Sequence, residues 1–181
     1  MAVTIDGTTG ISAVQDGTVT ATDLTNTLDL TGKDVTLPAG VGGKVLQVVQ
    51  GVFSSPSSTG GTSFADTGLS ASITPSNTSS KILVMVNQPL SIYTNQTSPR
   101  DIAFNIVRES TMITIGFGEM DTDTNAGVRT SSGNYLIYLD SPSTTSLTTY
   151  KTQFKLNGTA ADVFAQQHGT ESTITLMEIA E

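Results

Sequence analysis

The residues that follow position 43 form short apolar runs typical of β-strands, and almost none of them carries a helical periodicity. Examples are GKVLQVVQGVFSS, ITPSNTSSKILVMVNQ and ESTITLMEIAE. Ser, Thr, Gly, Asn and Pro, which favour turns, separate these runs. Roughly eight such strands within about 140 residues predict an all-β fold, either a β-sandwich or a jelly roll.

The individual strands are predicted from alternation and apolar content. In Leu147–Leu156 the alternation places Tyr150, Phe154 and Leu156 on one face. Arg108-Glu109-Ser110-Thr111 reads as a hairpin turn, and Ala160–Gln167 alone has a helix-tolerant composition. Strands are expected at Lys44–Gln50, Ile82–Val86, Ile102–Val107, Met112–Phe117, Tyr135–Leu139, Leu147–Leu156 and Ile174–Ile179.

A cluster of small residues, Pro38-Ala39-Gly40-Val41-Gly42-Gly43, marks the clearest domain boundary. Residues 1–43 are predicted to be an extended N-terminal arm of short strands, which anchors or intertwines, and residues 44–181 a jelly-roll knob domain. A flexible tail is the alternative for the arm, although the alternation in Asp34–Leu37 favours a strand. The arm's apolar residues are too sparse for a core of their own: Val3, Ile5, Ile11, Val14, Val19, Leu24, Leu28, Leu30, Val35 and Leu37.

Composition argues against several classes of partner and chemistry. The net charge is −8 and the eight basic residues are scattered, so no nucleic-acid partner is expected. The chain has no cysteine, which excludes disulfides, Cys-ligated zinc and thiol nucleophiles. Its apolar stretches are too short to span a membrane. MAVTIDGTTG lacks the features of a secretory signal, so any route out of a cell is expected to differ from the usual secretion pathway.

Three motifs resemble a metal-binding, a phosphate-binding and a catalytic site, but each lacks residues that such a site needs. Asp121-Thr-Asp123-Thr-Asn125-Ala-Gly127 resembles a calcium loop, but Ala and Ser132 occupy the positions where an EF-hand needs Gly and Glu. Gly42-Gly43-Lys44 fails as a phosphate loop, because Pro38 replaces the first glycine and Val45 follows the lysine. His168, the single histidine, is predicted in a loop without the carboxylate and nucleophile of a Ser-His-Asp site.

Two further patterns carry little weight. A glycosidase needs two apposed carboxylates, and the 16 acidic residues leave that possibility open, but no spacing supports it. Glycosylation sequons at Asn77, Asn95 and Asn157 are expected by chance in a Thr-rich chain. We therefore predict that the protein is not an enzyme and has no catalytic, cofactor-binding or metal-binding residues.

Three segments of the knob resemble a domain of tailed-bacteriophage structural proteins. They are Gly43-Lys44-Val45-Leu46-Gln47-Val48, Thr74-Pro75-Ser76-Asn77-Thr78-Ser79-Ser80-Lys81-Ile82-Leu83-Val84, and Ser172-Thr173-Ile174-Thr175-Leu176-Met177-Glu178-Ile179. Related regions are similar to the trimeric jelly rolls of the tumour-necrosis-factor and complement C1q kind. The resemblance covers about three-quarters of the chain and implies a homotrimeric virion protein, found on capsids as well as on tail fibres.

The function expected from these features is structural. The first expectation is a trimeric capsid decoration or cement protein that stabilises the phage head by binding the major capsid protein. The alternative is a short tail-fibre or receptor-binding tip that contacts a host surface glycan or protein. The 43 residues of the arm leave no room for the long shaft and tail anchor of a typical fibre, which favours decoration.

Overall fold

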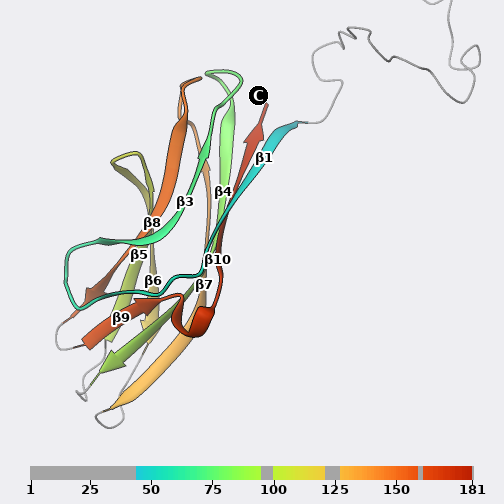
Figure 1. Cartoon of the computed structure of the whole chain (residues 1–181). Helices are drawn as coiled ribbons and strands as arrows, with labels where there is room; N and C mark the ends of the chain where they lie inside the picture. Colours follow the sequence, from blue (N-terminus) through green and yellow to red (C-terminus); the bar gives the residue numbers. More distant parts are fainter. Residues whose placement is uncertain (1–43, 95–99, 121–126, 159–160, 181) are drawn as a thin grey trace, which may run out of the picture. The chain divides into compact units, whose positions relative to one another are not determined.

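The computed structural model describes residues 44–94, 100–120, 127–158 and 161–180. These residues contain ten strands and one short 3-10 helix, η1 (Gln167–Gly169), and no α-helix (Figure 1). The strands are β1 (Val45–Phe53), β2 (Ser57–Thr59), β3 (Ala65–Ile73), β4 (Lys81–Thr94), β5 (Arg100–Arg108), β6 (Thr111–Met120), β7 (Val128–Asp140), β8 (Thr148–Asn157), β9 (Ala161–Ala165) and β10 (Ser172–Ile179).

The first sheet is organised around β4, the longest strand. β7 pairs with β4 over the full stretch from Ile82 to Thr94. On the opposite edge, β10 pairs with residues 81–87 of β4 and β9 with residues 90–94. β9 and β10 therefore lie end to end as one interrupted strand, with η1 at the interruption. β1 and β2 pair with β10 and β9 and complete the sheet.

The second sheet has four antiparallel strands in the order β3-β8-β5-β6. It faces the first sheet across a shared core (Figure 1). The β5–β6 hairpin turns at Glu109 and Ser110, as predicted, with Arg108 paired to Thr111. Glu109 has a φ of 54°, which serves the tight turn. The predicted all-β, two-sheet sandwich is thereby confirmed.

The core lies between the sheets, and alternation along strands such as β8 and β10 places its side chains there, whereas β5 is buried on both faces from Ile102 to Val107. Every second residue of β8 is buried, and Tyr150, Phe154 and Leu156 are 0% exposed, as their common face predicted. Two apolar clusters fill the interior. One surrounds Tyr150 and the other surrounds Phe154.

The structure differs from the sequence prediction in three places. Ala160–Gln167, the segment with helix-tolerant composition, forms β9 from Ala161 and enters the 3-10 turn at Gln167, because pairing with β4 outweighs local propensity. β4 and β7 are much longer than predicted, since polar residues and Pro89 interrupt their apolar runs. The strand β3, ADTGLSASI, has few large apolar residues and was not predicted at all.

Two predictions fall outside the described residues. The N-terminal arm, residues 1–43, and the core of the calcium-like loop, residues 121–126, belong to the undescribed part of the chain. The division of the chain into an arm and a knob, and the rejection of calcium binding, therefore stay predictions.

Candidate functional site

The outer side of the first sheet carries large apolar side chains in register across four strands. Val48, Met177, Leu83 and Leu139 form one cross-strand row, because their strands pair at these positions. Met85 and Ile137 lie in the next row, and Tyr135 in the row after it. We call this surface the apolar face and define it by Val48, Leu83, Met85, Tyr135, Ile137, Leu139 and Met177.

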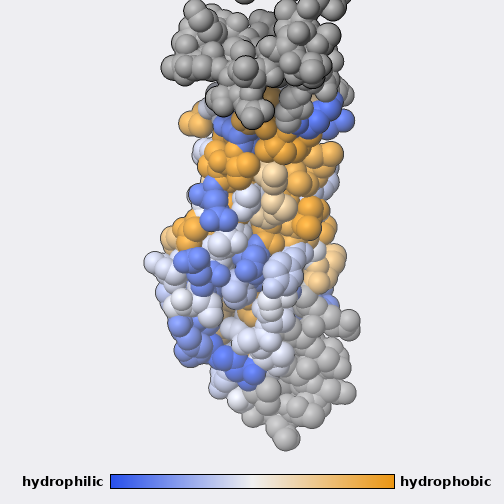
Figure 2. Space-filling view, turned by 90° about the vertical axis from the view of Figure 1, so that its right-hand side faces the viewer, coloured by the Kyte–Doolittle hydropathy of each residue, from blue (hydrophilic) through white to orange (hydrophobic). Residues whose placement is uncertain are grey.

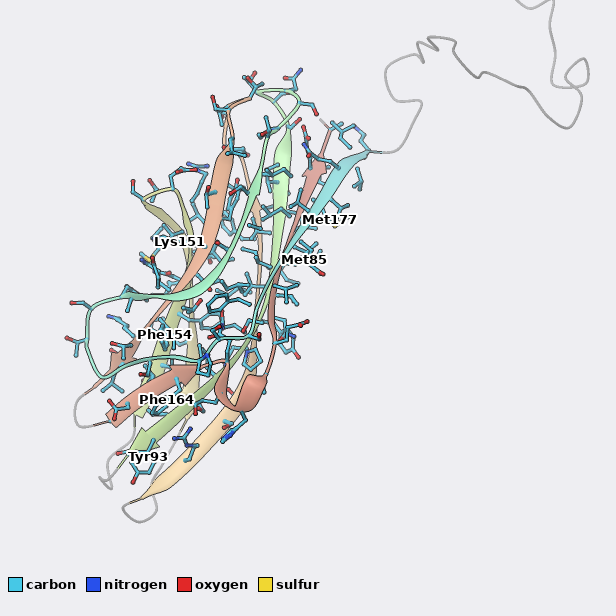
Figure 3. All side chains as sticks on the ribbon, viewed as in Figure 1. Met85, Tyr93, Lys151, Phe154, Phe164 and Met177 are labelled. Carbon is cyan, nitrogen blue, oxygen red and sulfur yellow. The ribbon has the colours of Figure 1, made fainter. Side chains whose placement is uncertain are left out.

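The apolar face is open to solvent in the single chain. Tyr135 and Ile137 are 70% and 69% exposed, and Val48 and Leu139 are also more than half exposed. Figure 2, which views the molecule from this side, shows the apolar side chains as an orange area over the sheet. Met85 and Met177 project from the same side in Figure 3. A contiguous apolar area of this kind marks an interaction surface more often than a free one.

A pocket of about 420 Å³ opens beside the apolar face, where the interrupted strand leaves the sheet. Neither β9 nor β10 pairs with Gln88 or Pro89 of β4, so β4 lacks a neighbour on that edge. The residues that line the pocket from β4 and β7 include Pro89, Ser91 and Gly133. The hollow exists because these residues are small and because η1 forms a wall in place of a strand.

The walls of the pocket combine aromatic and polar groups. Phe164 of β9 lies opposite Ser91, and Tyr135 of β7 lies opposite Asn87. Arg129 places its guanidinium carbon 4.6 Å from the centre of the Phe164 ring and donates a 2.9 Å hydrogen bond to Oε1 of Gln167. Through these two contacts Arg129 links β9 to η1. Figure 3 labels Phe164 on β9 and Tyr93 on β4.

Within the described residues, the hydroxyl of Ser91 is buried and has no hydrogen-bond partner. Alternation along β4 turns this side chain outward, towards the pocket that it lines. Leaving a buried hydroxyl unpaired costs about 1–3 kcal/mol. Such a group in a native protein calls for an explanation, and a partner from outside the chain is one.

A layer of polar side chains crosses the interior between the two apolar clusters. Nε2 of Gln88 donates to Oγ of Ser172 at 2.7 Å, and Oε1 of Gln88 accepts from Oγ1 of Thr152 at 2.9 Å. Oγ1 of Thr152 is also 2.6 Å from Oγ1 of Thr67, and Nε2 of Gln166 donates to Oγ of Ser172 at 3.0 Å. We call these five fully buried residues, Thr67, Gln88, Thr152, Gln166 and Ser172, the polar belt.

A buried carboxylate joins the two sheets at one end of the sandwich. Asp140 of β7 accepts hydrogen bonds of 2.9 and 2.8 Å from Nη1 of Arg108 and one of 2.7 Å from the Tyr150 hydroxyl. Burial and the bond to Asp140 raise the pKa of Tyr150 well above its usual value. The phenol therefore stays protonated as a donor. These bonds tie β7 of the first sheet to β5 and β8 of the second.

Glu178 holds the same end of the first sheet. Its fully buried carboxylate accepts hydrogen bonds from Nε2 of Gln47 and from the backbone N–H of Ser76, each 2.6 Å long, and from the Ser76 hydroxyl at 3.1 Å. Burial alone would raise the pKa of Glu178, but the hydrogen bonds from Gln47, Ser80 and Ser76 outweigh it and lower the pKa. Glu178 thus fixes β1 and the β3–β4 loop to β10.

The residues considered from the sequence are placed as follows. His168 is exposed in η1, as its predicted loop position implied, and it lines the pocket. Among the described residues, no cluster of three or more His, Asp or Glu side chains is arranged to hold a metal ion. None of the helical segments described is long and apolar enough to cross a membrane.

The polar belt and the pocket were not found from the sequence. Gln88 and Pro89 look like the end of an apolar run, and the pocket gathers residues from four separate segments. The apolar face did leave a signal. ILVMV and YLIYL are continuous apolar runs, typical of strands that are covered on both faces.

Comparisons with known proteins give no family. No protein-family model matches the chain, and no curated protein matches it. Among solved structures, the chain is similar to dimeric latent PorU from Porphyromonas gingivalis, with 10% sequence identity and a TM-score of 0.35. That match covers 78% of this chain and 14% of the PorU chain. At this score the similarity carries no argument, and the resemblance to tailed-phage proteins stays a prediction.

Proposed function

We propose that the chain is a structural protein of a phage virion that assembles as a homotrimer through the apolar face. The open apolar face is the observation that carries the assembly. Four of its residues are more than half exposed, and its strands are apolar on both sides. Strands that are apolar on both sides leave apolar area in contact with water unless both faces are covered, and the second sheet covers only one.

A second copy of the chain is the cover we propose. In a closed symmetric oligomer the apolar faces of identical chains cover one another, so no other protein is needed. It also places apolar area in a shared interior, where burying a large aliphatic side chain contributes about 1.5–3 kcal/mol. The formal charge of the chain is negative, but Lys81 is the single charged residue among the outward positions 81–87 of β4, so charge repulsion across that strand is small.

We propose further that the sandwich is a jelly roll. The strand order supports this reading. One sheet has the order β1-β10-β4-β7 and the other β3-β8-β5-β6, so an early strand lies beside a late one throughout the outer half of each sheet. This order results when a long antiparallel hairpin of paired strands wraps around a barrel, which is the jelly-roll pathway. The sequence resemblance to trimeric jelly rolls points to three copies.

The place in the virion follows from the sequence resemblance rather than from geometry. We propose a capsid decoration protein whose residues 1–43 bind the major capsid protein or a neighbouring subunit. The alternative is a short tail-fibre or receptor-binding tip, whose exposed loops contact the host. Both roles need a stable, non-catalytic, trimeric knob, so the apolar face serves either.

Light scattering tests the assembly. Wild-type protein should give three times the 18.8 kDa of the chain, and a stable monomer at micromolar concentration would reject the trimer. Ile137→Ser should weaken assembly, because covering a side chain that is 69% exposed contributes about 1–2 kcal/mol per copy. Three copies give about 3–6 kcal/mol, or roughly a 10²–10⁴-fold weaker association.

The matched control for Ile137→Ser is Phe117→Ser. Phe117 is 64% exposed on β6 of the second sheet, away from the apolar face. Its replacement should leave the oligomeric state unchanged. Equal loss of assembly in both variants would mean that the apolar face is not the contact surface.

Binding to empty capsids separates the two virion roles. The full chain should bind phage heads that lack it and should be present in hundreds of copies per particle. Deleting residues 1–40 should leave a folded trimer that no longer binds the heads. If the full chain ignores heads but binds host cells, the receptor-binding role replaces decoration. If the truncated knob still fills the heads, the arm is not the anchor.

A further inference from the structure

We propose that the pocket between β4, β7 and η1 binds a neutral carbohydrate. The pocket shares Tyr135 with the apolar face, but the rest of its lining lies outside that face. The inference assigns a ligand class to the pocket itself. Its volume of about 420 Å³ lies in the lower part of the range for small-ligand pockets. That size suits one or two sugar rings.

The aromatic side chains supply surfaces for the apolar faces of a sugar ring. Tyr135 is 70% exposed, and Phe164 lies across the pocket at the Ser91 row. Tyr combines an apolar ring with a polar hydroxyl at its tip. A pyranose has the same dual character, since its C–H groups gather on one face and its hydroxyls point outward at the rim.

The polar groups match hydroxyls rather than charges. Asn87, Gln167 and Thr170 offer amide and hydroxyl groups, each of which can donate and accept hydrogen bonds. No Asp, Glu, Lys or Arg lines the pocket in the described part of the chain. Arg129 lies behind this lining, where it stacks on Phe164 and donates to Gln167. An anionic ligand needs a cation and a cationic ligand needs a carboxylate, so a neutral ligand rich in hydroxyls fits this lining best.

The unpaired hydroxyl of Ser91 is the second, independent observation. It is buried, it has no partner among the described residues, and it belongs to the pocket lining. A small movement of the Ser91 side chain toward the pocket would let a ligand hydroxyl give it the hydrogen bond it lacks. The unpaired Ser91 hydroxyl, which destabilises the free protein, would then contribute to the affinity for the ligand.

The wall of the pocket is fixed before any ligand arrives. Gln166 and His168 adopt left-handed φ values of 54° and 57°, which non-glycine residues rarely do. The side chain of buried Gln166 is held by Ser172, and Gln167 accepts a hydrogen bond from Arg129. Such a constrained wall lowers the ordering cost of binding.

Saturation-transfer NMR on the full-length protein tests the proposal. The probes are the methyl glycosides of glucose, galactose, mannose and N-acetylglucosamine at millimolar concentration, with N-acetylneuraminic acid as the anionic comparison. At least one neutral glycoside should receive saturation from the wild type. No signal from any neutral glycoside, or binding of N-acetylneuraminic acid alone, would overturn the proposal.

Two variants locate the site. Gly133→Leu should fill the pocket, because a Cβ at Gly133 comes no closer than 3.4 Å to the Tyr135 hydroxyl and its φ is not left-handed. Tyr135→Ala should remove the stacking surface. Each should weaken glycoside binding about tenfold or more, whereas Phe117→Ala, an exposed aromatic on the other sheet, should not. Unchanged binding in both pocket variants would refute the assignment.

Light scattering on the same samples keeps the two proposals apart. A trimer without glycoside binding refutes the pocket and leaves the assembly standing. A monomer that binds a neutral glycoside refutes the assembly and leaves the pocket standing. Because Tyr135 also belongs to the apolar face, a Tyr135→Ala sample that has dissociated is judged by Gly133→Leu instead.

Discussion

The polar belt should couple the two sheets, and a double-mutant cycle between Gln88 and Thr152 measures that coupling. Gln88→Met keeps an apolar chain of similar length and removes the acceptor for the Thr152 hydroxyl at 2.9 Å. Thr152→Val keeps the shape and removes that donor. Both side chains are 0% exposed, so water cannot replace the lost bond.

The magnitudes follow from which groups are left unpaired. Gln88→Met removes one bond each from Thr152 and Ser172, which keep their bonds to Thr67 and Gln166. Each single change removes buried hydrogen bonds and should lower the free energy of unfolding by about 1–3 kcal/mol. After Thr152→Val, the Gln88 carbonyl keeps only a 3.5 Å contact to Thr67. The double variant removes both members of the pair, so its loss should be about 1–2 kcal/mol smaller than the sum of the single losses.

Urea unfolding at one fixed protein concentration measures all four proteins, because oligomerisation makes stability depend on concentration. Thr149→Val is the control on the same strand. Its hydroxyl pairs with Ser72 at a half-buried position, and the change should cost under about 0.5 kcal/mol. Losses that add within about 0.5 kcal/mol would show that Gln88 and Thr152 do not act as a pair.

Three further predictions concern stability. Glu178→Gln should destabilise the protein at pH 7. The difference in unfolding free energy from wild type, measured by urea titration, should shrink as pH falls below about 4.5, because the stability that comes from the lowered pKa of Glu178 is lost as its carboxylate is protonated in the folded protein. A difference that stays constant with pH would refute this. Gly51→Ala should cost about 1–3 kcal/mol or more by thermal melting, since its Cβ would overlap the Ser70 carbonyl oxygen; an unchanged melting temperature would contradict the packing. Tyr150→Phe should cost about 1.5–3 kcal/mol in urea by removing a donor to Asp140, and an unaltered midpoint would count against it.

The sequence predicted the parts of the fold that depend on local patterns. Alternation in β8 placed Tyr150 and Phe154 in the core, and the hairpin at Glu109 was read from its neighbours. β3 was missed because pairing with β8, and not its own composition, makes it a strand. The segment that forms β9 shows the same effect, since its pairing with β4 overrides a helix-tolerant sequence.

The candidate sites also differ in whether the sequence could predict them. The apolar face was readable in principle, because ILVMV and YLIYL are apolar at outward and inward positions alike. The pocket was not readable, because it arises where η1 interrupts a strand and where residues far apart in sequence meet. Gln88 was equally hidden, since polar Asn87-Gln88 before Pro89 indicates a strand end unless the partners of Gln88 in β8 and β10 are known.

The position of β10 has a consequence for how the chain reaches its folded state. β10 lies inside the first sheet, between β1 and β4, so the earliest described strand pairs with the latest. During synthesis, β1 must wait for nearly all the remaining residues before its neighbour emerges. Closure over so large a sequence separation slows folding. The apolar strands β4 and β7 are meanwhile exposed to solvent and can aggregate, so the chain is most vulnerable before β10 has been made.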